Sequence, residues 1–173
     1  MFTEQYMHFK KQLFVSIADS SFQNYTAFDG STVSVQSSSL GYCDIGANIA
    51  YAQCRAPANG YSGVYFGTGT TPAKKSDISL ENIIETGLEI TNSAAVWTEP
   101  SAGVYENSAT YVVKNIGDAD VTISEVGFFS SYRNGSTNYM PVLFERTVLA
   151  SPIIISPGSA KVITYKLTFN QSQ

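Results

Sequence analysis

The sequence has little charge, one histidine, two cysteines and no long apolar run. Only 14% of its 173 residues are charged, well below the roughly 25% of an average soluble domain. The formal net charge of −4 provides no basic field for phosphates, so we expect no nucleic-acid partner. The single histidine, His8, cannot by itself supply a catalytic triad or a histidine-ligated zinc site, and it lies off the apolar stripe described below, so we assign it no role.

Cys43 and Cys54 match no zinc pattern, and the chain lacks the partners for a four-ligand site. A disulfide between them is geometrically possible, but the first apolar run is too short for a signal peptide, so we expect both thiols to be reduced. No stretch approaches the roughly 18 apolar residues of a membrane-spanning helix. We therefore predict a soluble protein made in the cytoplasm, with no cofactor and no membrane partner.

What the sequence does contain changes character near residue 20. Residues 1–20 are predicted to form an N-terminal arm, and residues 21–173 a single β domain. The arm carries an apolar stripe at helical spacing, consisting of Phe2, Tyr6, Phe9, Leu13 and Ile17. A helix over 4–18 and a strand over 12–18 both fit this pattern. The stripe needs a partner surface, which is either the chain's own domain or a neighbouring subunit.

After Asp19 the apolar residues alternate with period two. Two short runs, 25–28 and 32–35, flank Asp29-Gly30, a dipeptide suited to a type I′ hairpin turn. A weak strand is predicted at 48–53 and a buried strand end at 64–66. The one internal helical signal runs from Asp77, as N-cap, to Gly87.

From residue 88 onward the pattern is strand after strand, separated by turn residues. The predicted strands are 88–97, 103–114, 121–131, 139–148 and 160–169. Seven to nine short antiparallel strands without alternating helices predict an all-β fold, an antiparallel two-sheet β-sandwich of jelly-roll or immunoglobulin-like type. The predicted core is Phe28, Val33, Val35, Val64, Phe66, Leu88, Ile90, Val96, Tyr111, Val113, Val121, Ile123, Val126, Phe128, Leu143, Val162, Tyr165, Leu167 and Phe169.

Two segments invite a catalytic or binding interpretation. Residues 67–75 look like a phosphate-binding loop, but Ala73 precedes Lys74 and Pro72 stands where a third glycine is needed, so we interpret them as a tight turn after a strand. Asn115, Asp118, Asp120 and Glu125 could offer oxygen ligands to calcium, but only side chains on one face of a strand can converge, and Gly117-Asp118 is an ordinary turn pair, so we do not favour a calcium site. A structural role for Glu125, paired with Arg146, is favoured over a catalytic one.

The aromatic residues admit two interpretations. Eleven tyrosines and Trp97 fit either a core and subunit interface, which we favour, or a platform for stacking sugars. The sugar-binding alternative predicts exposed aromatic residues, such as Tyr61, Tyr105, Tyr132 or Tyr139. We predict no catalytic, cofactor-binding or metal site residues and no enzymatic activity, because the residues provide no clear nucleophile–base pair or metal cluster.

Three stretches of the β region resemble segments of structural proteins of tailed bacteriophages. They are 64–72 continuing through 77–82, 112–129 with its Glu-Val-Gly ending, and 142–149 together with 156–158 and 162–165. The resemblance implies a non-enzymatic virion protein: a head decoration, a neck or collar component, or a tail or fibre-attachment module. Its implied partners are itself, as a symmetric homo-oligomer, and other virion proteins. A carbohydrate-binding module or adhesin that recognises host-surface glycans is the alternative.

Overall fold

The computed structural model describes residues 1, 3, 22–36, 51–55, 57, 62–134 and 138–170, some of them by backbone alone. Ten strands are formed, and no helix occurs in these ranges. Their bounds are β1 Phe22–Thr26, β2 Thr32–Gln36, β3 Ala52–Gln53, β4 Gly63–Gly67, β5 Leu88–Asn92, β6 Val96–Ser101, β7 Val104–Asn115, β8 Val121–Asn134, β9 Asn138–Ile155 and β10 Ala160–Asn170. The all-β prediction is therefore confirmed for the described part of the chain.

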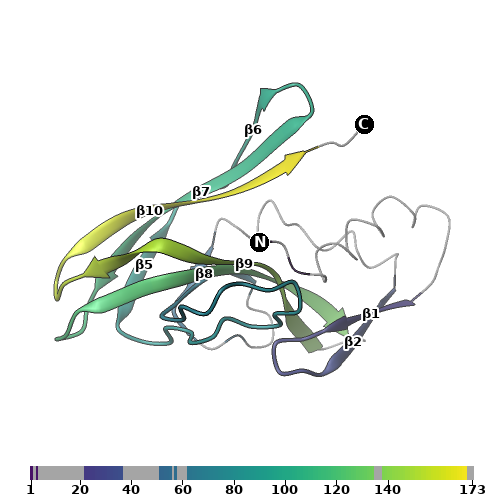
Figure 1. Cartoon of the computed structure of the whole chain (residues 1–173), viewed down its shortest axis with the longest axis horizontal. Coiled ribbons are helices and arrows are strands. Elements are labelled where there is room, and N and C mark those ends of the chain that lie inside the picture. The colour runs from purple at the N-terminus through teal and green to yellow at the C-terminus, as the bar shows by residue number, and fades with distance from the viewer. Residues whose placement is uncertain are drawn as a thin grey trace.

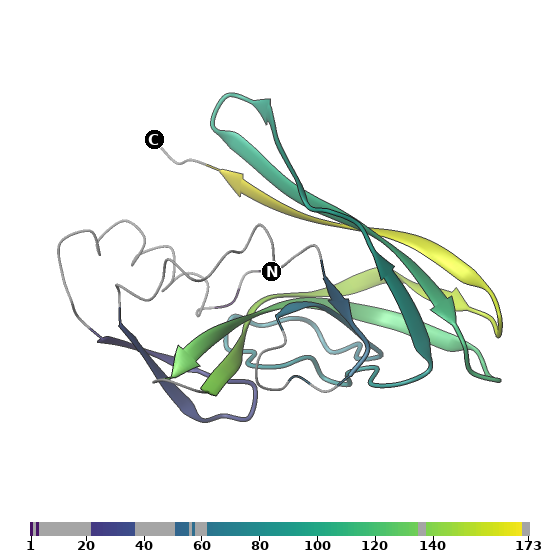
Figure 2. The same cartoon turned by 180° about the vertical axis from the view of Figure 1, so that it is seen from behind.

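The strands form a hairpin and two four-stranded sheets. Sheet I has the order β3-β4-β8-β9, and sheet II has the order β10-β7-β5, with β6 also pairing with β7. All pairs are antiparallel except β3 with β4. Figures 1 and 2 show that the two sheets lie close together at one end and diverge toward β6, while the β1–β2 hairpin lies beside the far end of β8 and β9.

The main core lies between the two sheets, which explains why apolar and polar residues alternate along strands such as β7. Phe66 and Phe128 of sheet I pack with Tyr111, Val113 and Leu167 of sheet II in one buried cluster. The rings of Phe66 and Tyr111 meet edge to face, with centroids 6.2 Å apart. A second, smaller cluster, consisting of Tyr65, Leu80, Phe129 and Leu143, fills the other face of sheet I. Because sheet I is buried on both faces, β4 has no exposed residue.

Most residues of the predicted core are buried or pack against the two buried clusters, but two are exposed. Val96 is 55% exposed and Val162 is 70% exposed. Ile163, Tyr165 and Leu167 of β10 belong to the core, so Val162 must point to the opposite face of sheet II. Val96 is exposed because every residue of β6 is exposed. The side chains of Val33, Val35 and Phe169 lie outside the described set.

The predicted helix from Asp77 to Gly87 is wrong. This segment is an irregular part of the β4–β5 loop, residues 68–87, and its amides are used by tertiary partners. The N–H of Ile84 donates to the carbonyl of Phe66, and the N–H groups of Glu81 and Asn82 donate to the Glu125 carboxylate. A helix needs these N–H groups for its own backbone hydrogen bonds. Because they bond to Phe66 and Glu125 instead, tertiary contacts override the local helical pattern.

The predicted hairpin forms, but its type I′ turn is wrong. A type I′ turn needs a positive φ at both central residues, Asp29 and Gly30. Gly30 has a φ of 82°, but no non-glycine residue in the described ranges, Asp29 included, has a positive φ. The N–H of Gly30 donates instead to the carbonyl of Ala27, and the Asp29 carboxylate accepts the N–H of Ser31. The predicted strand 88–97 is also divided, because the chain leaves β5 at Asn92 and starts β6 at Val96. The proposed helix or strand of the N-terminal arm lies outside the described residues.

Candidate functional site

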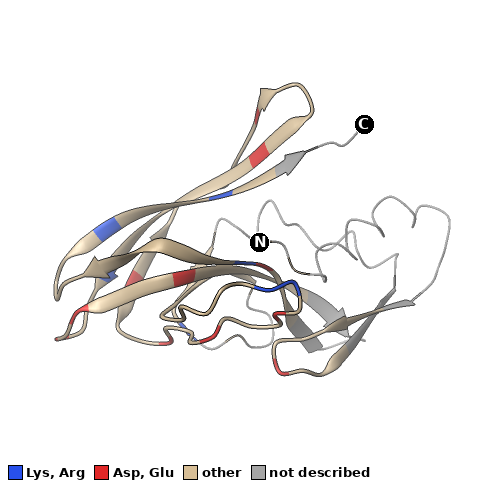
Figure 3. Cartoon of the chain, in the orientation of Figure 1, with Lys and Arg blue, Asp and Glu red and all other residues tan. Residues whose placement is uncertain are grey.

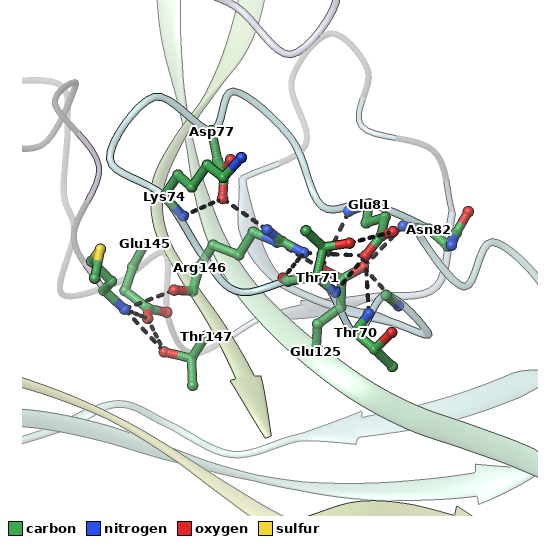
Figure 4. Close-up of polar contacts among 12 residues, drawn as sticks. Thr70, Thr71, Lys74, Asp77, Glu81, Asn82, Glu125, Glu145, Arg146 and Thr147 are labelled. Atoms are coloured by element: carbon green, nitrogen blue, oxygen red, sulfur yellow. Dashed lines mark hydrogen bonds and ion pairs between the residues drawn. The ribbon is translucent and has the colours of Figure 1, made fainter. Parts of the chain in front are cut away.

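The densest group of polar contacts surrounds Arg146, in the middle of β9. Its side chain is only 4% exposed, and it lies between β8 and the β4–β5 loop (Figure 4). The guanidinium donates from Nε to Glu125 Oε2 at 2.8 Å and from Nη1 to Asp77 Oδ2 at 2.8 Å. Nη2 donates to the carbonyl of Thr71 at 3.1 Å. One side chain therefore joins two points of the loop to a buried carboxylate of the sheet.

Glu125 is fully buried on β8, and all its contacts are structural. Besides the Arg146 bond, Oε1 accepts the N–H groups of Gly69 at 3.1 Å and Asn82 at 2.9 Å. Oε2 also accepts the N–H of Glu81 at 3.2 Å. A carboxylate with four donors is stabilised in place and has no free lone pair directed at a substrate. The predicted pairing of Glu125 with Arg146 is confirmed.

Glu81 forms a second clamp on the rim of the same cluster. Its Oε2 accepts the N–H groups of Thr70 and Thr71, both at 2.9 Å, and Oε1 accepts the Thr71 hydroxyl at 2.8 Å. The backbone and side-chain hydrogen bonds from Thr71 lower the pKa of Glu81. Burial alone lowers the pKa of Arg146, but the hydrogen bonds to Asp77 and Glu125 outweigh it and the net change is upward. Both groups are held in their charged forms.

The loop that looks like a phosphate-binding loop binds anions that belong to its own chain. Gly67 ends β4, and Gly69 lies against Glu125, where an added Cβ would approach Oε1 to 2.5 Å. The N–H groups of Gly69, Thr70 and Thr71 are all directed at carboxylates. The chain leaves β4 at Gly67, but residues 68–74 form an irregular segment and no tight turn, and Glu81 and Glu125 hold this segment in place.

The structure does not bring the suggested calcium ligands together. Asn115 is buried and uses its side chain to close the β7–β8 turn, donating to the carbonyls of Ala119 and Ile155 and accepting the N–H of Gly117. Asp118 and Asp120 are exposed in that turn, while Glu125 is committed to Arg146. Among the residues that the structure describes, no three or more His, Cys, Asp or Glu side chains form a group that could hold a metal ion.

A second polar cluster links the two sheets at Glu145. Its Oε2 accepts the Tyr165 hydroxyl of β10 at 2.7 Å, and its Oε1 contacts the Met1 ammonium at 2.8 Å and the Thr147 hydroxyl. Thr3 also binds β9, because its N–H donates to the carbonyl of Phe144. A groove of about 310 Å³ runs beside the cluster, between Thr164–Thr168 of β10 and the residues Glu145, Thr147 and Met1.

The other candidate residues are dispersed. Trp97 is 54% exposed and Tyr105 is 38% exposed, both near the β6 end of sheet II. Tyr132 and Tyr139 lie in β8 and β9, where only their backbone is described. The Cys54 thiol forms no disulfide with a described residue, and burial raises its pKa. His8, Cys43 and Tyr61 fall outside the described ranges.

Sequence reasoning missed the partners of Arg146 in the loop. Asp77 has the signature of a helix N-cap, and it does accept an N–H three residues away, but that donor is Lys74 on its N-terminal side. The Glu145–Tyr165 contact also has no local signal, because the two residues are brought together only by the packing of β9 against β10. Asn107 is similar: it is buried on β7, and its side-chain amide has no hydrogen-bond partner among the described residues, which its polar type does not predict.

Protein-family models, curated proteins and solved structures contain no match to this chain. In the part of the chain that the structure describes, no helix is long and apolar enough to cross a membrane.

Proposed function

We propose that this chain is a non-enzymatic structural protein of a tailed-bacteriophage particle, acting by assembly with copies of itself and with other virion proteins. Its place in the particle would be a head decoration, a neck or collar component, or a tail accessory protein. The architecture that we propose is a jelly-roll or immunoglobulin-like sandwich preceded by an arm over residues 1–20. This identification rests on the sequence resemblance, and the surface of sheet II gives it physical support.

The observation that carries the assembly role is a group of exposed valines on the outer face of sheet II. Val112 and Val162 are direct neighbours on β7 and β10, and both are exposed. Val96 adds a third exposed apolar side chain on the same face, at β6. Acidic and basic residues both occur along the strands of sheet II (Figure 3), and four of them neutralise each other as the pairs Lys114–Glu89 and Lys166–Glu106. Such a face suits permanent contact with other protein surfaces better than it suits a free monomer.

The polar clusters favour a structural role over catalysis. Glu125 and Arg146 saturate each other and the backbone around them, so neither is available as an acid, a base or a nucleophile toward a substrate. Their evident effect is to fix the β4–β5 loop in one conformation on the surface of sheet I. Rigid surface loops are common contact elements in assemblies.

Mass spectrometry of purified virions tests this proposal directly. We expect peptides of the chain in intact particles, at a stoichiometry that is a multiple of the particle's symmetry, and we expect density for a β-sandwich in electron microscopy. The ratio to the major capsid protein then separates a head decoration from a tail component. Absence of the chain from intact virions would overturn the proposal.

Carbohydrate binding is the second candidate, and exposed aromatic residues favour it. Trp97 lies directly opposite Asn107 in the β6–β7 register, and Tyr105 lies two residues away on β7, so the two aromatic side chains are on one face. Aromatic faces stack on sugar rings. A glycan array should then give signals that Trp97→Ala and Tyr105→Ala abolish, whereas Val112→Ala retains them. No signal with the wild-type protein would remove this candidate.

A further inference from the structure

Strand β10 forms one edge of sheet II and is unusually regular. All its eleven residues are paired in one continuous register with β7, from Ala160 opposite Lys114 to Asn170 opposite Val104. On its other side it has no strand partner within the described residues. A straight, unpaired edge of this length presents main-chain groups that can pair with another strand.

The hydrogen bonds at the β7–β10 turn show which groups of β10 are free. The N–H of Asn115 donates to the carbonyl of Ser159, which is the residue opposite it in the register. In an antiparallel ladder such bonded pairs alternate with non-bonded pairs, so the odd-numbered residues of β10 bond to β7. The even-numbered residues Val162, Thr164 and Lys166 therefore direct their N–H and carbonyl groups away from β7, into the open edge.

The other side of β7 supports this assignment. The N–H of Ile116 donates to the carbonyl of Gly87, and the N–H of Ser93 donates to the carbonyl of Thr110. Even-numbered residues of β7 thus bond toward β5, which leaves its odd-numbered residues for β10. The two ladders agree.

Few of the features that usually block edge pairing are present on β10. It contains no proline and no bulge, and its one lysine near the centre, Lys166, is compensated by Glu106 of β7 at 2.8 Å. The edge of β9 differs, because Met1 and Thr3 already bond to Arg146 and Phe144 there.

We propose that β10 pairs antiparallel with β10 of a second copy of this chain, which joins two copies of sheet II into one continuous sheet. A two-fold axis near Thr164 places Val162 opposite Lys166 of the partner subunit. This arrangement covers Val162, which is 70% exposed in the single chain, with the aliphatic part of that lysine. The pairing deepens the assembly role proposed above and rests on it.

Strand length and charge together select the register, because an axis at Val162 would pair only residues 160–164 of each copy. With the axis at Thr164, the two copies of Lys166 are four residues apart along the paired strands, about 13 Å at the usual rise of a strand. An axis at Lys166 would instead place the two ammonium groups directly opposite each other, which is unfavourable. The Thr164 register pairs residues 160–168 of both copies and forms about ten main-chain hydrogen bonds.

Opposite charge substitutions at Val162 test the pairing. Val162→Glu places a carboxylate opposite Lys166 of the partner subunit, and Val162→Lys places an ammonium there. Sedimentation equilibrium of the wild-type chain should show a particle of twice 18.7 kDa. We expect Val162→Glu to tighten dimerisation by roughly 2- to 30-fold and Val162→Lys to weaken it by a similar factor, because two symmetric cross-strand contacts change together. Since Val162 is exposed, both variants should fold.

A proline substitution tests the main-chain groups themselves. Thr164→Pro removes an N–H that points outward and keeps the β7 ladder, so it should abolish dimerisation while circular dichroism stays that of a β protein. Thr164→Ala is the matched control, because it loses the same hydroxyl and retains the N–H. Hydrogen exchange should slow at Val162, Thr164 and Lys166 as the protein concentration rises.

The results separate this pairing from the wider assembly role. A wild-type chain that stays monomeric up to about 1 mM overturns the β10 pairing, even if virions contain the protein. A dimer that Thr164→Pro and the two Val162 variants leave unchanged also overturns it, because its interface then lies elsewhere. A dimer that responds as expected, in a chain absent from virions, upholds the pairing and overturns only the virion assignment.

Discussion

Arg146 and Glu125 form an ion pair that is worth most to the protein when both members are present. Neither side chain has appreciable contact with solvent, and the pair is completed by backbone donors from the loop. Creating such a pair contributes little net stability because both charges lose water. Removing one partner is costly because the other charge stays buried without compensation.

Arg146→Met should therefore destabilise the chain by about 3–5 kcal/mol, since it leaves Glu125 buried without its cation. Urea unfolding followed by circular dichroism measures this loss. Lys166→Met provides the control, because Lys166 and Glu106 form an exposed pair that is worth about 1 kcal/mol or less. Equal, small losses in the two variants would contradict the view that Arg146 holds the cluster together.

Gly67 is the position where the cluster leaves no room for a side chain. An added Cβ would lie 2.5 Å from Glu125 Oε1 and 2.6 Å from the carbonyl oxygen of Asn82. Gly67→Ala should cost about 1–3 kcal/mol, because these atoms are fixed by hydrogen bonds. Gly117→Ala is the comparison, since there an added Cβ would meet only Asn115 Oδ1, at 3.3 Å. Thermal unfolding that ranks the two variants the other way would show that the loop can move aside.

At the scale of single residues, the sequence predicted the Glu125–Arg146 pair but not the loop residues Asp77 and Glu81 beside it. Regular alternation in β8 places Glu125 on the face of Val121 and Ile123, toward the core or beside Arg146. The Arg146 contact forms, but a register shift between Ile123 and Glu125 puts the carboxylate on the opposite face of sheet I, under the loop. Nothing local links Asp77 or Glu81 to Arg146, because these residues are separated by the irregular path of the β4–β5 loop. A helical pattern at Asp77 even points the other way. Long-range contacts between a loop and a sheet leave no periodic trace.

The β4–β5 loop is the element whose conformation depends most on charge. It has almost no regular structure beyond the bridge between Ile83 and Gly67, and it is held by Glu81, Glu125 and Arg146. The low pKa of Glu81 means that the folded loop favours its ionised form. This contribution is complete above the ordinary carboxyl pKa of 4.5 and is lost as the pH falls through the lower pKa of the folded state.

Acid should therefore loosen the loop at Thr70 and Thr71 before the sheets unfold. Hydrogen exchange at the Thr70 and Thr71 amides, divided by the intrinsic rates, should lose protection as the pH falls below about 4.5. In Glu81→Gln the protection should be lower at pH 6 and should lack the step that belongs to this carboxylate, because the amide oxygen still accepts but does not titrate. Identical pH profiles in the two proteins would show that the Glu81 carboxylate does not control this segment.

At the scale of elements, alternation predicted the later strands well. β7, β8 and β10 agree with their predicted bounds to within a few residues. β7 and β10 bury every second side chain against sheet I, whereas β8 is buried on both faces. β9 continues seven residues further than expected, to Ile155, through Pro152 on an edge strand where a missing N–H is tolerated. No alternation marks the division of 88–97 into β5 and β6, because β6 pairs with β7 outside the core and all its residues are exposed.

For the whole molecule, cohesion depends on how sheet II packs on sheet I. Tyr111 and Tyr165 belong to sheet II and are buried between the sheets, and Tyr165 donates its hydroxyl to Glu145 of β9. Burial raises the pKa of both tyrosines, and the neighbouring Glu145 raises that of Tyr165 further. The sandwich therefore requires both phenols to stay protonated.

Alkaline pH should open the sandwich for this reason. For a group whose folded pKa is raised, the stabilisation is complete below the unfolded pKa of about 10 and is lost as the pH rises toward the folded value. Of the eleven tyrosines, Tyr111 and Tyr165 should ionise only together with unfolding. Absorbance at the phenolate band, followed alongside circular dichroism, should show that these two phenols ionise only as the β signal is lost. Tyr165→Phe should lower stability at neutral pH, because Glu145 loses a charged hydrogen bond, and should reduce the alkaline loss that Tyr165 contributes. Reversible ionisation of all eleven tyrosines with the β signal intact would show that the two sheets separate far more easily than their shared core implies.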